Sequence, residues 1–176
     1  RIKDGYIIAE AKNGLKGSKI KFTSISVGAT ENAILAAFGA DGETVLSNCA
    51  IEPEIIDLIQ FLKKLGGKIK RSGRKIIIIG STNHREKTYH KVIFDRIEAG
   101  TYLIAGALSS KKIIINKIKP KVIKCEIEIL KKMGVKIITT KNTLTVIKPK
   151  TLKRVDITTK PYPGFPTDLQ AQLMVL

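Results

Sequence analysis

Two stretches of the chain carry apolar residues at the three- and four-residue spacing that is typical of an amphipathic helix. The apolar positions are Ile55, Leu58, Ile59, Leu62 and Leu65 in the first stretch, and, less regularly, Val122, Cys125, Ile129 and Leu130 in the second. Gly66 and Gly134 follow the two stretches, and a glycine just past the last turn commonly ends a helix. We predict a helix over 53–65 and a second one ending before Gly134.

Segments rich in isoleucine and threonine follow each of these glycines in pairs. They are 68–70 and 75–79 in the first case, and 136–140 and 143–147 in the second. Turn-forming residues join the members of each pair, Ser72-Gly73 and Lys141-Asn142. This pattern predicts two β-hairpins.

The two helix–hairpin stretches are copies of one pattern. Residues 48–69 align with 116–137, so that Asn48 matches Asn116 and the segment LKKLG matches LKKMG. Repeats of this kind indicate an architecture that is built from similar units.

A helix with many small residues precedes each copy, at 29–40 and 98–108, and a third start follows at 155–159. The predicted unit is therefore β-α-β-α-β-β, and stacked units would bury their helices against one another with the sheets outside. The predicted fold class is α/β (α+β). The chain has no G-x-G-x-x-G or Walker loop, which argues against a Rossmann fold.

Length and composition fit a globular protein. The chain has 176 residues, of which 43% are hydrophobic, and no unbroken apolar run approaches the ~20 residues of a membrane span. We therefore expect no membrane partner. The sequence begins with Arg1 and stops within a helix-like pattern at Leu176, so we expect an internal fragment of a longer protein.

The chain is strongly basic, with a formal net charge of +17. Such a field is typical of nucleic-acid binders. The excess, however, is 26 Lys against 6 Arg, spread along the whole chain without Trp, whereas arginine is the usual residue for bidentate base and phosphate contacts. We expect no specific nucleic-acid binding, and a basic nucleic-acid-binding module stays as the alternative from a different class.

Cysteine and histidine give no metal-ligand pattern. Cys49 and Cys125 lack a second ligand at zinc-site spacing, and His84 and His90 lie in a polar stretch that predicts surface histidines. We predict no metal site and no cofactor. Two lone cysteines fit a reducing compartment, and we expect a cytoplasmic protein.

A loop of small residues, Ser24-Ile25-Ser26-Val27-Gly28, opens the first small-residue helix. Free backbone N–H groups at a helix N-terminus suit a phosphate group. The alternative is a simple cap, with Ser26 or Thr30 accepting helix amides.

Acidic residues lie at three further helix starts. Thr167 and Asp168 open the last helix, where the pattern allows either a cap with Thr167 at the N-cap or a catalytic role for Asp168. Asp95 and Arg96 are predicted to form a surface ion pair of small value. The segment Glu52-Pro53-Glu54 opens the helix over 53–65, and favourable interaction with the helix dipole explains its two acids.

Four segments together resemble the UDP-N-acetylglucosamine 1-carboxyvinyltransferase family, the enolpyruvyl transferases that begin peptidoglycan synthesis. These segments are 26–30 (SVGAT), 52–57 (EPEIID), 95–101 (DRIEAGT) and 165–172 (FPTDLQAQ). The resemblance covers essentially the whole chain. It implies two globular domains that are inside-out α/β barrels of repeated β-α-β-α-β-β units, with the active site between them.

The resemblance also implies the domain organisation and the chemistry. Residues 1–94 would end the first domain, on the UDP-sugar side, and 95–176 would start the second, both being incomplete. The family transfers the enolpyruvyl group of phosphoenolpyruvate to the 3′-hydroxyl of UDP-N-acetylglucosamine. Asp168 would be the acid/base and would also bind substrate, and residues 24–28 would line the uridine-diphosphate end of the site.

The sequence departs from the family at Ser24, where many members carry a lysine. The family's mobile loop and its Lys-Asn pair should lie upstream of Arg1, so we expect the isolated chain to be inactive. An enolpyruvyl transferase that uses shikimate 3-phosphate, on the same fold, is the alternative within the class.

Overall fold

A computed structural model of the chain describes residues 1–81, 87–108 and 112–176, and divides it into two compact units. Unit 1 spans Arg1–Lys91 and unit 2 spans Val92–Leu176. The division falls three residues before the predicted boundary at 94/95. The assignment of the two units to two different domains of a larger protein stays a prediction. Within the described residues, no helix is both long and apolar enough to cross a membrane.

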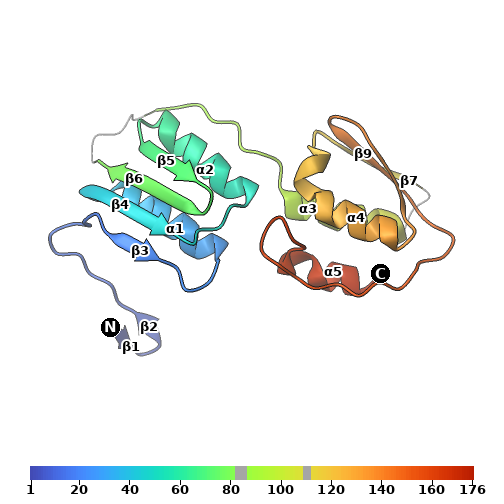
Figure 1. The fold of residues 1–176 in the computed structure, drawn as a ribbon, viewed down its shortest axis with the longest axis horizontal. Coiled ribbons are helices and arrows are strands. Elements are labelled where there is room, and N and C mark those ends of the chain that lie inside the picture. Colours follow the sequence, from blue (N-terminus) through green and yellow to red (C-terminus); the bar gives the residue numbers. More distant parts are fainter. Residues whose placement is uncertain (82–86, 109–111) are drawn as a thin grey trace. The chain divides into compact units, whose positions relative to one another are not determined.

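Unit 1 contains a four-stranded sheet, a small two-stranded ribbon and two helices (Figure 1). The elements are β1 (Ile2–Lys3), β2 (Tyr6–Ile7), β3 (Lys19–Lys21), α1 (Val27–Phe38), β4 (Gly42–Ser47), α2 (Pro53–Lys64), β5 (Lys68–Ser72) and β6 (Lys75–Gly80). The sheet order is β3-β4-β6-β5. β3 and β4 are parallel, and the other neighbours are antiparallel.

Unit 2 repeats most of this arrangement. Its elements are α3 (Arg96–Leu108), β7 (Lys112–Asn116), η1 (Pro120–Ile123), α4 (Lys124–Lys132), β8 (Lys136–Thr139), β9 (Thr143–Ile147), η2 (Thr167–Leu169) and α5 (Gln170–Met174). The sheet order β7-β9-β8 matches β4-β6-β5 of unit 1. Within the described residues unit 2 has no counterpart of β3, so the β-α-β-α-β-β unit is complete only in unit 1.

Alternation along the strands places one face of each sheet against the helices. In β6, Ile76 and Ile78 are fully buried, whereas Ile79, on the opposite face, is 48% exposed. This is the two-residue period of a strand with one covered face. Each unit has its own apolar core. Unit 1 buries Ile34, Leu46, Ile55, Ile59, Leu62 and Ile69 among others, and unit 2 buries Leu103, Ile123, Leu130, Leu144, Val146 and Leu169.

The helix ends agree with the sequence patterns. α2 ends at Lys64, and Gly66 follows in the left-handed region at φ +99°. Gly134 takes φ +93° after α4. In both cases the missing side chain removes the steric cost of that backbone conformation.

The predicted third β-α-β-α-β-β unit starts at 155–159, and the strand that would open it is not formed. Only Thr159 forms a single bridge pair, with Phe165, in this part of the chain. The β-branched residues there have no neighbouring strand among the described residues, and a strand needs a partner for its backbone N–H and C=O groups.

Candidate functional site

The segment 24–28 forms the turn between β3 and the first residues of α1. Ser26 is the N-cap of α1, and its Oγ accepts a hydrogen bond from the Ala29 N–H at 3.2 Å. The predicted cap at Ser26 is therefore confirmed. It leaves the N–H groups of Val27 and Gly28 without an acceptor among the described residues, as expected for the first turn of a helix.

Thr30 does not cap the helix but ties it to the next connection. Its Oγ1 donates to the Ser26 carbonyl at 2.7 Å and accepts from the Ala50 N–H at 3.0 Å. Thr30 is fully buried. The start of α1 is thus fixed against the segment that leads into α2, which holds the free N–H groups of Val27 and Gly28 in place.

Gly28 has no structural requirement to be glycine. Its φ is not positive, and a Cβ at this position would have no heavy atom within 4 Å. Glycine inside a helix costs roughly 0.5–1 kcal/mol relative to alanine. The open space above its backbone is suited to close approach by a ligand.

Asp168 lies exposed in η2, directly before α5. The prediction that Thr167 is the N-cap is wrong, because Pro166 holds that position and makes no side-chain cap. Phe165 and Leu169 on either side are 3% and 0% exposed. These buried neighbours anchor the segment in the core of unit 2 and leave the Asp168 carboxylate in solvent.

The prediction of a surface ion pair between Asp95 and Arg96 is wrong in placing Arg96 at the surface. The Asp95 Oδ1 accepts from the N–H groups of Ile97 at 2.7 Å and Glu98 at 3.1 Å, so Asp95 caps α3. Arg96 is only 7% exposed, and its guanidinium lies 5.8 Å from the centre of the Tyr162 ring. This cation–π contact joins α3 to the segment before Asp168, and no local pattern indicated it.

Glu126 is a buried acid that the sequence pattern did not predict. It is 3% exposed in α4. Burial raises the pKa of its carboxyl, and the positive charge of Arg96 partly opposes the rise. Its position in the helix gave no signal, because the apolar stripe of α4 is irregular.

The two acids at the start of α2 differ from each other. Glu54 lies in the first turn, as predicted, but Glu52 precedes the helix and is 4% exposed. An oxygen of Glu52 accepts from the Ile51 N–H at 2.8 Å. A third acid, Glu31 in α1, has its pKa raised by burial and by the negative charges of Glu54 and Glu52.

His90 is not a surface histidine. Its side chain is 9% exposed, its Nε2 lies 3.1 Å from the Asp57 Oδ1, and its ring centre lies 5.5 Å from that of Phe61. Neither ring nitrogen has a hydrogen-bond partner within the described residues, so the Asp57 carboxylate is a close neighbour of the ring and not its hydrogen-bond acceptor. His84 lies outside the described residues.

The structure brings no metal ligands together in the part of the chain that it describes, where no group of three His, Cys, Asp or Glu residues could hold an ion. Cys49 and Cys125 are free thiols in different units. Burial is the main cause that raises the pKa of each thiol, and a raised thiol pKa lowers the fraction of reactive thiolate.

Comparison with known proteins defines the class. The whole chain, residues 1–176, matches the family model of EPSP synthase (3-phosphoshikimate 1-carboxyvinyltransferase). Its fold is similar to that of the enolpyruvyl transferase NikO from Streptomyces tendae, with a TM-score of 0.68 and 25% identity over 83% of this chain and 35% of that one. EPSP synthase from Acinetobacter baumannii, at a TM-score of 0.55 and 23% identity over 82% of this chain and 34% of that one, shares the fold. The chain belongs to this family of enolpyruvyl transferases, which confirms the predicted fold class.

The curated relatives are more specific. The chain is 52% identical over its whole length to UDP-N-acetylglucosamine 1-carboxyvinyltransferase of Pelagibacter ubique (strain HTCC1062). It is 47% identical over 99% of its length to the protein of the same name from Endomicrobium trichonymphae. In both cases it spans 42% of the relative's length. These relatives confirm the resemblance drawn from the four sequence segments, and they do not favour the shikimate alternative.

Proposed function

We propose that the chain is part of an enzyme that transfers the enolpyruvyl group of phosphoenolpyruvate to the 3′-hydroxyl of UDP-N-acetylglucosamine, in peptidoglycan synthesis. The observation that carries the proposal is the 52% identity over the full chain to a relative of that name. The substrates are cytoplasmic metabolites in this proposal, and the enzyme acts there.

The reaction has two steps. The sugar oxygen adds to C2 of phosphoenolpyruvate while C3 takes up a proton, which gives a tetrahedral intermediate. Loss of phosphate from C2 and of a proton from C3 then restores the double bond. The net products are the enolpyruvyl ether and phosphate.

In this proposal, Asp168 is the general base that accepts the proton of the sugar hydroxyl. A carboxylate is a weak base for an alcohol in water, and loss of surrounding water increases its basicity. The exposed position of Asp168 beside two buried anchors suits this role. The side chain is open to substrate while its backbone is held by the core.

Residues 24–28 are assigned to the diphosphate of the nucleotide sugar. The unpartnered N–H groups of Val27 and Gly28 and the positive end of α1, a helix of 12 residues, favour an anion there. Ser24 and Ile25 precede the cap and complete the loop. Ser24 offers a hydroxyl group where a lysine would offer a charge, so binding relies more heavily on the backbone.

The domain assignment belongs to the same proposal. Residues 1–94 would belong to one lobe of the enzyme and 95–176 to the other. The chain alone would then lack the rest of both lobes, and we expect it to show no turnover.

Replacement of Asp168 in the full-length protein tests the proposal. For Asp168→Ala we expect kcat to fall roughly 10²- to 10⁴-fold, the range of a general base. Binding of UDP-N-acetylglucosamine, measured by calorimetry, should change only a few-fold. The matched control is Asp156→Ala, which removes an exposed aspartate of the same unit and should leave kcat unchanged.

Two results would contradict different parts of this proposal. An unchanged kcat in Asp168→Ala would remove Asp168 from the mechanism. Phosphate release with shikimate 3-phosphate but not with UDP-N-acetylglucosamine would overturn the proposed substrate.

A further inference from the structure

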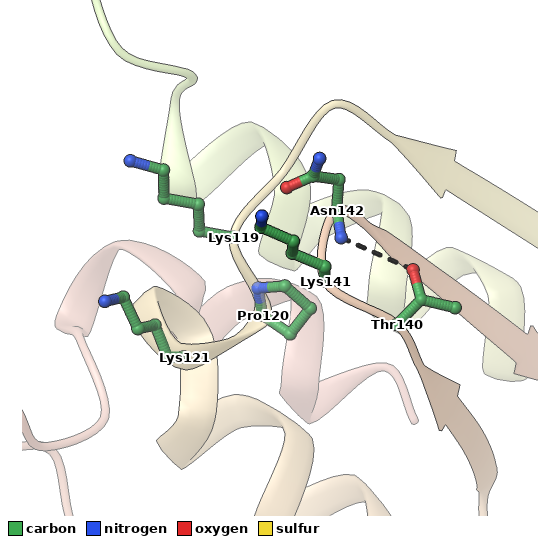
Figure 2. Close-up of a pocket in the computed structure, with 6 residues that line it drawn as sticks. All are labelled: Lys119, Pro120, Lys121, Thr140, Lys141 and Asn142. Atoms are coloured by element: carbon green, nitrogen blue, oxygen red, sulfur yellow. Dashed lines mark hydrogen bonds between the residues drawn. The ribbon is translucent and has the colours of Figure 1, made fainter.

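Unit 2 has a hollow of about 330 Å³ where two of its loops meet (Figure 2). We call it the junction pocket. Its lining residues are Lys119, Pro120, Lys121, Thr140, Lys141 and Asn142. One loop leads from β7 into η1, and the other is the turn between β8 and β9.

The walls of the junction pocket are well defined. The Ile118 N–H donates to the Asn142 carbonyl at 3.2 Å and joins the two loops. The Thr140 Oγ1 accepts from the Thr143 N–H at 3.1 Å and contacts the Thr143 Oγ1 at 2.7 Å, which fixes the turn. The position of Lys119 before Pro120 restricts it to extended backbone, and its φ of −106° and ψ of 101° agree.

Three of the six residues that line the junction pocket are lysines, and no carboxylate lines it within the described residues. The three lysines, Lys119, Lys121 and Lys141, are exposed, and none of them forms an ion pair with another described residue. Three like charges around one hollow repel one another, and a bound anion would remove this repulsion.

The corresponding loops of unit 1 have no lysine at the three matching positions. There the Cys49 N–H donates to the Arg74 carbonyl at 2.9 Å, as Ile118 does to Asn142. In the alignment of 48–69 with 116–137, Lys119 and Lys121 match Ile51 and Pro53, and Gly73 takes the place of Lys141 in the other turn. Because a similar backbone arrangement occurs in unit 1 without a charge at these three positions, the three lysines are not required by the fold.

We propose that the junction pocket binds a small anion with a diphosphate group. Lysine ammonium groups act as point charges toward phosphate oxygens. A diphosphate carries more negative charge than a single carboxylate, so it can neutralise more of the three lysines. The volume exceeds that of a single phosphate and falls at the lower end of small-molecule sites. The proposal does not depend on the proposed catalytic function.

Titration of the 176-residue chain with inorganic pyrophosphate tests the proposal. Backbone amide NMR shifts, followed at 0.15 M salt, report the junction pocket and the 24–28 loop separately. We expect saturable shifts at 119–121 and 140–142, with tighter binding of pyrophosphate than of orthophosphate. In the triple variant Lys119→Gln/Lys121→Gln/Lys141→Gln, the apparent Kd for these shifts should rise about tenfold or more.

The matched control is Lys148→Gln/Lys150→Gln/Lys153→Gln, which removes three exposed lysines of the same unit. It should retain the shifts and their midpoint. Equal weakening in both variants would assign the binding to the general lysine field and overturn the proposal. Absence of saturable shifts at the junction pocket, or equal affinity for orthophosphate, would overturn it as well.

Discussion

Units 1 and 2 have separate but similar apolar cores, and they differ in the loops where a strand leads into a helix. Leu62 and Leu130 are buried at matching positions of α2 and α4, and Ile69 and Ile137 at matching positions of β5 and β8. The loop in front of the helix carries glutamates in unit 1 and lysines in unit 2. The periodic apolar positions determine the framework, so the loops can differ in charge without changing the fold.

The difference extends to burial as well as to charge. Glu52 is 4% exposed and accepts from a backbone N–H, whereas Lys119, which likewise precedes a proline, is exposed. In unit 1 the charged residue is part of the folded structure. In unit 2 it faces solvent and is available to a ligand.

Exchange of the two charges gives the largest expected effect. Glu52→Lys would place an ammonium group in a buried position and remove the acceptor of the Ile51 N–H. We expect the free energy of unfolding of unit 1 to fall by roughly 2–4 kcal/mol. Lys119→Glu should change the stability of unit 2 by no more than about 0.5 kcal/mol.

Urea unfolding of the 176-residue chain, with hydrogen exchange to assign each loss to a unit, measures both variants. Equal destabilisation by the two substitutions would show that Lys119 also has a structural role. The contrast between the two loops would then be wrong.

The sequence predicted those parts of the structure that depend on neighbours along the chain. The helix over 53–65, the glycines that end the helices and the cap at Ser26 all follow from local spacing and are confirmed. The fold class follows from the repeat for the same reason.

Contacts between distant segments could not be predicted. The burial of Arg96 depends on Tyr162, and that of His90 depends on Asp57 and Phe61. Each partner lies tens of residues away, and an isolated arginine or histidine gives the same local pattern whether it is exposed or packed. The strand expected at 155–159 is wrong for a similar reason, because β-branched residues indicate a strand only where another strand is within reach.

Two helical glycines, one in each unit, provide a contrast of intermediate size. A Cβ on Gly100 of α3 would clash with the Cδ1 of Leu169, which is fully buried. Gly100→Ala should therefore destabilise unit 2 by about 1–3 kcal/mol through overpacking. Gly28→Ala meets open space and should stabilise unit 1 by up to roughly 1 kcal/mol.

In the full-length enzyme, Gly28→Ala should also change a kinetic constant. Gly28→Ala should raise KM for UDP-N-acetylglucosamine, because the added methyl group occupies the space that the diphosphate would approach. If Gly28→Ala lowers the stability of unit 1 and leaves KM unchanged, the glycine is structural and the assignment of the 24–28 loop is wrong.

The smallest expected effect is a pH-dependent change in stability. It concerns the apolar stripes of helices α2 and α4, where Glu126 of α4 takes the position of Leu58 of α2. Because burial raises the pKa of Glu126 in the folded state, folding favours the protonated carboxyl. Its contribution to stability is fully present below the ordinary carboxyl pKa and is lost as the pH rises through the folded-state pKa. Glu126→Gln keeps the shape of the side chain without the ionisation. The gain in urea midpoint of this variant over the parent should therefore be larger at pH 7 than at pH 4.

The exposed Glu128 lies in the same helix and provides the control. Glu128→Gln should give no gain in urea midpoint at pH 7, because its carboxylate is exposed and lies 3.5 Å from the Lys124 ammonium group. A gain for Glu126→Gln that is the same at both pH values would mean that the backbone N–H of Glu126 and the charge of Arg96 together offset the burial of the carboxylate. The ionised Glu126 would then cost unit 2 no stability, although the matching residue of unit 1 is the apolar Leu58.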